Sequence, residues 1–201
     1  SSLMEKLILS EDEISRICGR LASEIEPKLK EDDNGMPVFV GVRNGALPFL
    51  FELVRHLKGA YWLDTRKVSS YNGESSTGKV TLEKEPDHNL EGRDVVLVED
   101  IIDTGTTRHF LKDFVRKKYK PKHLYVCVLV KRKNPKETYN ELADFTGLTT
   151  DEQRYIVGFG FDYYGLFRND PYVFVPSKDD RENWDKLLDD DKKKHPNQLR
   201  K

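Results

Sequence analysis

The chain has 201 residues, of which 37% are hydrophobic and 34% are charged, so it is long enough for one globular domain with a substantial core. Its formal net charge of -1 gives no electrostatic reason to expect nucleic acid or an anionic membrane as the main partner. No apolar run approaches the roughly 20 residues that span a bilayer. Two cysteines are too few for a disulfide framework, and a reducing, cytoplasmic setting is expected.

The first part of the chain is predicted to alternate helices and strands. Between residues 9 and 29, apolar side chains recur every three to four positions, which is typical of an amphipathic helix. Ser10 and Glu13 have the spacing of a capping box, and Pro27 is expected to end this helix early. Three elements follow: a buried strand at 36–42, a helix at 47–57 with Pro48 in its first turn, and an outward-leading strand at 60–71.

A polar segment covers residues 72–93. It holds Gly73, Gly78, Pro86 and Gly92, and only its "KVTL" stretch has the character of a strand. Loops of this length are usually functional or disordered. We therefore expect either a long mobile loop or a two-stranded flap here.

The second half of the chain continues the alternation. The predicted elements are a buried strand at 94–100, a helix at 106–118, a buried strand at 124–130, and two further strands at 155–161 and 172–175. The charged residues after 177 predict a short helix around Trp184, Leu187 and Leu188, followed by a frayed tail at roughly 189–201. Strands alternating with helices indicate an α/β fold with a mainly parallel sheet. Ligands of such sheets bind beyond the carboxyl ends of the strands.

The stretch "VVLVEDIIDTGTT" (residues 95–107) places three carboxylates after a buried strand. Gly105 and the neighbouring threonines then lead into the start of a helix, where unpaired N–H groups favour a phosphate. Glu99 and Asp100 suit vicinal sugar hydroxyls or a Mg²⁺ ion beside a polyphosphate. Together these features predict a site for a phosphorylated ribose. The alternative is a solvated turn in which Asp103 caps the helix.

This stretch resembles the phosphoribosyl-pyrophosphate (PRPP) signature of the type I phosphoribosyltransferases. Three further segments, "SSY", "LVKRK" and "YIVGFGFDYYGLFR", resemble the hypoxanthine-guanine branch of that family. The resemblance runs from roughly Ile8 to Val175. It implies a single domain over 1–201 with a mainly parallel central sheet flanked by helices. It also implies a small hood subdomain built from the N-terminal residues and roughly 150–190. A long mobile lid loop is implied at roughly 70–93, with Ser70 and Tyr71 as its first residues.

The resemblance implies transfer of the phosphoribosyl group from PRPP to N9 of a 6-oxopurine, with pyrophosphate released. Asp103 is the implied general acid/base beside the purine N7. Glu99 and Asp100 are expected to hold the ribose hydroxyls, directly or through Mg²⁺. The residues implied for the 5′-phosphate are Asp103, Thr104, Gly105, Thr106 and Thr107.

Other strand ends carry the implied purine and pyrophosphate contacts. Lys131 is expected to donate to the purine O6, and an ammonium there would repel the 6-amino group of adenine. The resemblance assigns ring stacking to Tyr155, the C2 edge to the Ile156 and Asp162 backbone, and a second Mg²⁺ to the Asp162 side chain.

Pyrophosphate is assigned to Arg43, Asn44, Gly45 and Arg168. The family commonly has an apolar residue, a lysine and a glycine at 43–45, whereas this chain carries its positive charge one position earlier. The family also has a non-proline cis peptide at this loop.

Several alternatives stay open at this level. Lys131 fits an exposed surface lysine, Tyr155 and Phe161 fit core residues, and the polar segment fits a disordered loop. The function has two alternatives: a xanthine-preferring phosphoribosyltransferase and a non-catalytic PRPP-sensing regulator. The expected partners are PRPP and the base, without nucleic acid or membrane, in a homodimer or homotetramer.

Overall fold

The fold is described from a computed structural model, over residues 4–29, 35–70, 80–102, 106–133 and 143–197, with residues 70 and 106–109 described by backbone alone. Within these residues, six strands form one sheet in the order β4-β3-β2-β5-β6-β7. All neighbours run parallel except β4, which is antiparallel to β3. The predicted α/β class with a mainly parallel sheet is therefore confirmed. The strands are β2 (Val38–Arg43), β3 (Trp62–Ser70), β4 (Val80–Leu82), β5 (Asp94–Ile102), β6 (His123–Arg132) and β7 (Phe145–Thr150).

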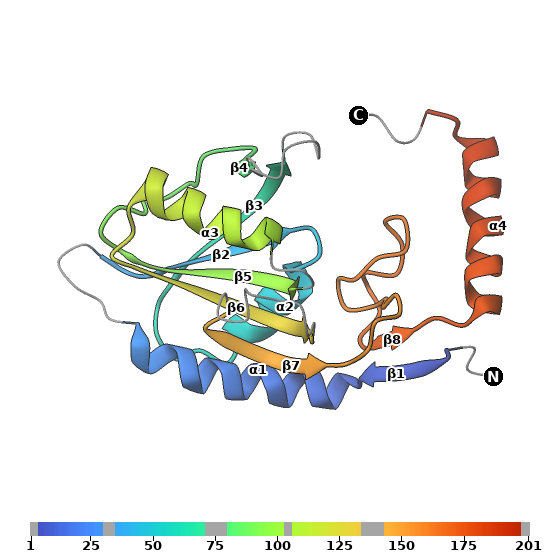
Figure 1. Ribbon diagram of the computed structural model, residues 1–201, viewed down its shortest axis with the longest axis horizontal. Helices are drawn as coiled ribbons and strands as arrows, with labels where there is room; N and C mark the ends of the chain where they lie inside the picture. Colours follow the sequence, from blue (N-terminus) through green and yellow to red (C-terminus); the bar gives the residue numbers. More distant parts are fainter. Residues whose placement is uncertain (1–3, 30–34, 71–79, 103–105, 134–142, 198–201) are drawn as a thin grey trace.

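Helices cover both faces of this sheet (Figure 1). α1 (Glu11–Ile25) and α2 (Leu47–Val54) lie on one face, and α3 (Thr106–Tyr119) lies on the other. The central strand β5 serves both layers: Val96 and Val98 belong to the core shared with α1 and α2, whereas Val95 and Leu97 belong to the core shared with α3. Burial on both faces explains why this strand reads as a continuous apolar run.

The first helix begins and ends as its sequence predicts. The Ser10 hydroxyl accepts from the Glu13 N–H at 3.1 Å, and the Glu13 carboxylate accepts from the Ser10 N–H at 3.1 Å. This capping box satisfies two backbone donors that the helix leaves unpaired. The helix stops at Ile25, and a 3₁₀ turn, η1 (Glu26–Lys28), contains Pro27.

A second, two-stranded sheet joins the two ends of the chain. β1 (Lys6–Leu9) pairs antiparallel with β8 (Val173–Val175). Neither β1 nor β7 (Phe145–Thr150) was predicted from the sequence. Both are short, and the Gly and Thr residues of β7 (FTGLTT) give a weak apolar alternation.

The predicted strand at 155–161 is wrong. The chain forms only isolated bridges there, among them Val157 to Phe174. Gly158, Phe159 and Gly160 have φ values of 102°, 49° and 99°, which lie outside the extended region that a strand requires. The segment instead turns sharply and forms the loop drawn between the large sheet and α4 in Figure 1.

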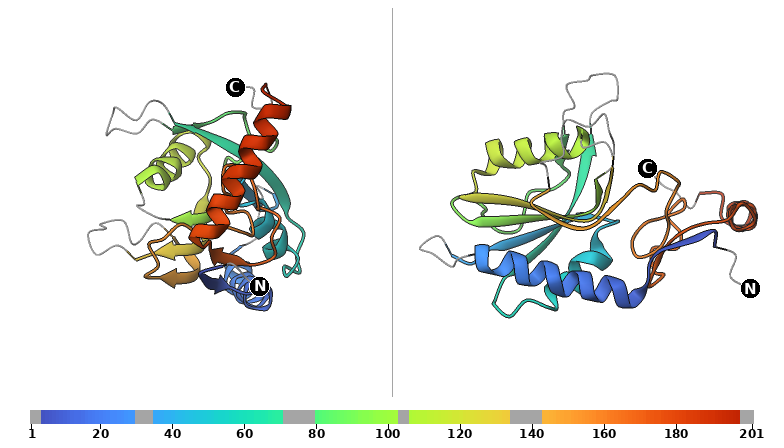
Figure 2. Two further views of the ribbon diagram at one scale, coloured as in Figure 1. Left: turned by 90° about the vertical axis from the view of Figure 1, so that its right-hand side faces the viewer. Right: turned by 60° about the horizontal axis from the view of Figure 1, so that its bottom comes forward.

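The C-terminal helix is longer than predicted. α4 spans Lys178–Lys194, 17 residues, and so includes the first part of the expected frayed tail. Ser177 and Asp180 form a second capping box, and Lys192–Lys194 complement the helix dipole in the last turn. α4 stands apart from the six-stranded sheet, beside the loop of residues 155–172 (Figures 1 and 2).

The polar segment after β3 contributes one short strand, β4, which pairs antiparallel with the end of β3. Val68 pairs with Leu82 and Ser70 with Val80, and the alternatives of a long mobile loop and a two-stranded flap within 72–93 stay predictions. Tyr71 and residues 72–79 lie outside the described residues. Among the described helices, none has both the length and the apolar character needed to cross a membrane.

Candidate active site

The carboxyl ends of β2, β5 and β6 meet at one edge of the large sheet. The register pairs Gly41 of β2 with Val98 of β5, and Ile102 of β5 with Lys131 of β6. The predicted residues at these strand ends therefore share one edge, which faces the loop of residues 155–172 (Figure 1). This is the edge at which open parallel sheets bind ligands.

The two carboxylates at the end of β5 differ in exposure. Glu99 is 1% exposed, whereas Asp100 is partly exposed. One Asp100 oxygen, Oδ1, accepts from the Ile101 N–H at 2.9 Å. The other, Oδ2, lies so close to Gly45 that a Cβ atom built there would come within 2.1 Å of it. Of this pair, Asp100 is the carboxylate with direct access to a ligand.

The loop after β2 packs against Asp100 and against Arg168. Its Arg43–Asn44 peptide is cis, as the family resemblance implied. The Arg43 side chain is exposed, and its Nε lies 3.5 Å from the Asn44 Oδ1. A Cβ built on Gly45 would lie 3.6 Å from Arg168 Nη1, so the structure brings Gly45, Asp100 and Arg168 together.

Arg168 also orders the loop that carries Asp162. Its Nη1 donates to the Gly160 carbonyl at 2.6 Å, and its Nη2 lies 3.2 Å from the Asp162 Oδ2. The same Asp162 oxygen accepts from the Gly165 N–H at 2.8 Å. The side chains of Arg168 and Asp162 are 32% and 35% exposed, so this ion pair remains open to an anionic ligand.

Tyr155 lies at the surface of this loop, and Phe161 lies in the core. Tyr155 is 50% exposed, which excludes the interpretation of this residue as core, while Phe161 at 6% fits that interpretation. The Tyr155 hydroxyl donates to the Asp162 carbonyl. Partial burial, with a contribution from the Asp162 carboxylate, raises the pKa of Tyr155 and keeps the phenol neutral. Ile156 is 5% exposed, so the predicted contact with a purine would have to come from its backbone and not from its buried side chain.

Lys131 ends the buried part of β6, with Ile102 and Thr149 as its neighbours across the sheet. It is partly buried, which argues against the alternative of a fully exposed lysine. The next residue, Arg132, is 7% exposed, and its guanidinium donates to the carbonyls of Glu152 and Arg154. Sequence reasoning missed Arg132 as an anchor of the chain before Tyr155. Successive side chains of a strand point to opposite faces of the sheet, so Arg132 and Lys131 lie on different faces. This alternation was the available sequence signal that Arg132 has a different role from Lys131.

Glu152 adds to this anchor. Its carboxylate accepts from Arg154 Nε at 3.0 Å, from Arg154 Nη2 at 2.8 Å and from the Arg154 N–H at 3.1 Å. These hydrogen bonds, with the charges of Arg154 and Lys6, lower the pKa of Glu152 to about 2. Glu152 is therefore a structural carboxylate that fixes the turn leading to Tyr155.

Part of the predicted site lies outside the described residues. This part comprises the proposed acid/base Asp103, Thr104 and Gly105 of the phosphate turn, and Tyr71 of the lid. Ser70, Thr106 and Thr107 are described by backbone alone: Ser70 ends β3, and Thr106 begins α3. Residues 103–105 thus lie in the chain between the end of β5 and the start of the 14-residue helix α3. That connection is where unpaired backbone N–H groups favour an anion.

The described residues contain no cluster of three or more His, Cys, Asp or Glu side chains arranged for a metal ion. Asp100 and Asp162 supply carboxylates at separate places of the ligand edge. Mg²⁺ is commonly held by one or two carboxylates together with substrate phosphates and water. The donors among the described residues therefore fit a Mg²⁺ ion that arrives with a polyphosphate.

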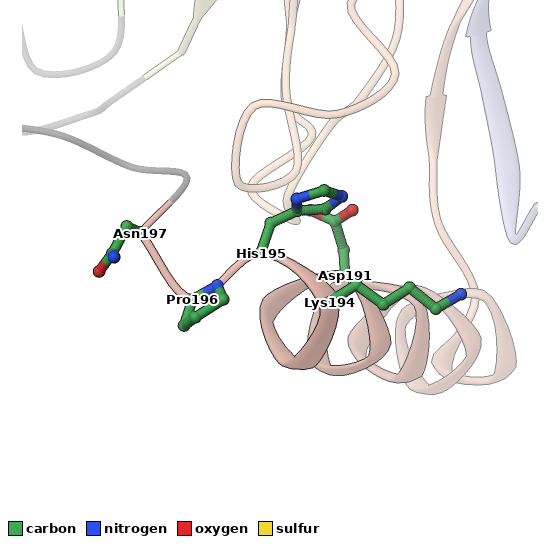
Figure 3. A pocket seen from close by; sticks show the side chains of 5 residues that line it. All are labelled: Asp191, Lys194, His195, Pro196 and Asn197. Carbon is green, nitrogen blue, oxygen red and sulfur yellow. The ribbon is translucent and has the colours of Figure 1, made fainter.

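Two hollows flank the C-terminal half of α4, away from this edge. Asp191, His195 and Pro196 line both of them, and neither includes a predicted site residue. Figure 3 shows the Asp191 and His195 side chains on one side of the helix end, with Lys194 pointing away from them. The predicted site residues lie instead at the carboxyl ends of β2, β5 and β6 and in neighbouring loops.

Comparison with known proteins identifies relatives over most of the chain. Residues 6–164 match the family described as phosphoribosyl transferase domain. A hypoxanthine-guanine-xanthine phosphoribosyltransferase from Tritrichomonas foetus is 38% identical over 86% of this chain and 91% of its own length. A hypoxanthine-guanine phosphoribosyltransferase from Bacillus subtilis is 34% identical over 86% of this chain and 93% of its own.

Solved structures agree with these relatives. A hypoxanthine phosphoribosyltransferase from Staphylococcus aureus superposes with a TM-score of 0.78 at 28% identity, covering 88% of this chain and 94% of that one. A hypoxanthine-guanine phosphoribosyltransferase from Bacillus anthracis superposes with a TM-score of 0.76 at 34% identity, covering 86% and 98%. The likeness thus extends from the sequence to the arrangement of the sheet and helices.

Proposed function

Because this chain belongs to the phosphoribosyltransferase family, in its hypoxanthine-guanine branch, we propose that it is a purine salvage enzyme. It transfers the 5-phosphoribosyl group from PRPP to N9 of a 6-oxopurine, hypoxanthine or guanine, and gives IMP or GMP and pyrophosphate. The observation that carries this conclusion is the meeting of Gly45, Asp100 and Arg168 at the same sheet edge as Lys131. That edge offers groups for both a phosphorylated sugar and a 6-oxo base.

The ribose and phosphate side follows from β5 and the turn after it. Asp100, with Glu99 behind it, accepts hydrogen bonds from the ribose hydroxyls. The turn Asp103–Thr107 holds the 5′-phosphate with backbone N–H groups and hydroxyls, supported by the helix start at Thr106. Asp103 relays the proton at the purine N7 and stabilises the positive charge that develops as the ribose C1 is attacked.

The purine side comes from β6 and the loop after β7. Lys131 donates to the purine O6, and Tyr155 stacks on the ring with its exposed face. The Ile156 and Asp162 backbones meet the edge around C2. A base with a 6-amino group places a donor opposite the Lys131 ammonium and is disfavoured.

Pyrophosphate leaves on the side of the loop after β2. The Arg43–Asn44 peptide and Gly45 present backbone groups there, and Arg168 supplies a partly exposed guanidinium. We propose Mg²⁺ as the metal, held by the substrate with Asp100, Glu99 and Asp162. When bound, the metal neutralises charge on the departing pyrophosphate.

Access to the site is assigned to two further parts. The lid at roughly 70–93, which begins with Ser70 and Tyr71, closes over the reacting carbon and excludes water. The hood comprises the N-terminal residues and roughly 150–190, a proposal that the pairing of β1 with β8 supports. The homodimer or homotetramer and the cytoplasmic setting stay predictions.

A spectrophotometric assay with PRPP, Mg²⁺ and each purine in turn tests the proposal. Hypoxanthine or guanine, or both, should give nucleotide product, and adenine should give none. Xanthine belongs in the same series, because the name of the Tritrichomonas foetus relative includes it. No product from any 6-oxopurine would overturn the enzyme in favour of the non-catalytic PRPP-sensing alternative, and product from xanthine alone would establish the xanthine-preferring one.

A further inference from the structure

The C-terminal helix α4 makes specific contacts with the loop that carries Tyr155. The Tyr163 hydroxyl donates to Asp185 Oδ1 at 2.6 Å. The ring of Trp184 lies 5.2 Å from the ring of Tyr163 and 4.2 Å from the ring of Phe167, measured between centroids. A hydrogen bond to a carboxylate is about twice as strong as a neutral one, so this contact holds Tyr163 in one place.

Tyr163 in turn contacts Tyr155. Their centroids are 6.0 Å apart, and their planes meet at 86°, an edge-to-face arrangement within the range of favourable aromatic pairs. Tyr155 is half exposed, and its own hydroxyl donates to the Asp162 carbonyl. A path of direct contacts therefore runs from α4 through Tyr163 to the proposed purine-stacking residue.

The contacts made by Trp184 and Asp185 lie in the N-terminal half of α4. Beyond Asp185, a hollow of about 650 Å³ lies between the helix and the loop. It is lined by Tyr164–Phe167 of the loop and by Leu187, Leu188, Asp191, Lys192, His195 and Pro196. Trp184 and Asp185 thus lie where the helix still touches the loop. The helix also lies beyond residue 164, where the match to the family domain ends.

We propose that Trp184 and Asp185 are positioning residues for purine binding, because they fix Tyr163 and through it the ring of Tyr155. This inference rests on the proposed function, in which Tyr155 stacks on the base. The hydrogen bond from Tyr163 to Asp185 also raises the pKa of Tyr163 to about 12, so the phenol keeps its donor proton over the working pH range. Removing either partner of the Tyr163–Asp185 hydrogen bond loosens Tyr163, which is one of two contacts that orient the Tyr155 ring; the other is the hydrogen bond from the Tyr155 hydroxyl to the Asp162 carbonyl.

The test compares Y163F, D185N and the double variant with the wild type. Each single variant should raise the KM for hypoxanthine or guanine roughly tenfold, with little change in kcat or in the KM for PRPP. The double variant should match the single ones, because both remove the same hydrogen bond. D190N is the control, since it removes an exposed carboxylate from the same helix. A purine KM that is unchanged, or that rises as much in D190N, would overturn the inference.

Three further outcomes are decisive. An equal rise in the KM for PRPP would show a general loss of structure and would also overturn the inference. Additive effects in the double variant would show that Tyr163 and Asp185 act separately, which contradicts it. An inactive wild type would overturn the proposed function and this inference with it, whereas an active wild type with unaltered variants would overturn the inference alone.

Discussion

Single side chains at the sheet edge divide into those that meet ligand and those that hold the site in shape. Asp100, Lys131 and Tyr155 are accessible from the edge, whereas Arg132 and Glu152 are more than nine-tenths buried. Both residues fix the turn before Tyr155: Arg132 donates to the carbonyls of Glu152 and Arg154, and the Glu152 carboxylate accepts from the side chain and the N–H of Arg154. A buried ion that makes several hydrogen bonds is costly to remove, because its loss leaves buried polar groups without partners.

The low pKa of Glu152 makes a prediction for the pH dependence of stability. The folded carboxyl has a pKa of about 2, against 4.5 for an ordinary glutamate, so the unfolded chain binds the proton more readily. Glu152 therefore stabilises the fold above pH 4.5, and this contribution is lost as the pH falls toward 2. E152Q should lower the free energy of unfolding at pH 7 and flatten its decline over that window, measured by urea unfolding.

The matched control for Glu152 is E91Q, which changes an exposed glutamate. Its pH profile should follow that of the wild type. If E152Q also shows the wild-type profile, then the ion pair with Arg154 is not what stabilises this turn.

Asp103 carries the proposed proton transfer. D103N should lower kcat roughly 100-fold, because an amide cannot relay the proton, and should leave PRPP affinity nearly unchanged. Stopped assays give kcat, and calorimetric titration gives PRPP binding. D113N, on the following helix, is the control. Comparable losses of turnover and of PRPP binding would argue against an acid/base role.

At the scale of elements, the site depends on close approach between two loops. A Cβ on Gly160 would lie 2.0 Å from the Gly45 carbonyl, and the φ of Gly160 is +99°. Only glycine meets both conditions, since a side chain is disfavoured at that φ and has no room beside the backbone. The loop after β2 and the loop carrying Arg168 are therefore fixed against each other.

G160A should destabilise the protein by about 1–3 kcal/mol and weaken pyrophosphate inhibition, because the two loops are forced apart. Thermal unfolding and product-inhibition kinetics measure the two effects. G165A is the matched control: its φ is +90°, but a Cβ there meets nothing within 4 Å. An equal loss of stability in both variants would attribute the effect to backbone conformation alone and not to the packing of the loops.

Elements were predictable where the local pattern agrees with the final packing. The capping box of α1, the place of Pro27 in η1 and the buried runs of β5 and β6 all follow from nearby residues. The strand prediction at 155–161 was wrong, although the aromatic and β-branched residues there suggest a strand. Gly158 and Gly160 take positive φ values, and they lie against the backbones of Tyr172 and Gly45. The length of α4 was missed because its charged sequence has few apolar residues to mark a helix face.

The whole molecule is a layered α/β domain with an added two-stranded sheet and a helix beside it (Figures 1 and 2). In the part of the chain that is described, no group of three or more His, Cys, Asp or Glu side chains could hold a metal ion. We therefore expect EDTA to abolish nucleotide formation and to leave the melting temperature within about 1 °C of the untreated protein, since a metal that binds with substrate adds no stability to the free fold. A fall of several degrees would indicate a resident ion. Activity restored by Mg²⁺ completes the test.

The sequence by itself determined the α/β class, the strand ends that carry the chemistry and the family resemblance, because buried runs and the "EDIIDTG" stretch are local features. Only the tertiary structure decided that Gly45, Asp100, Gly160 and Arg168 meet, that Arg132 is buried against the turn before Tyr155, and that α4 holds Tyr163. These contacts join residues far apart in the chain. No short-range pattern encodes them, because they arise when strand order and loop packing bring distant segments together.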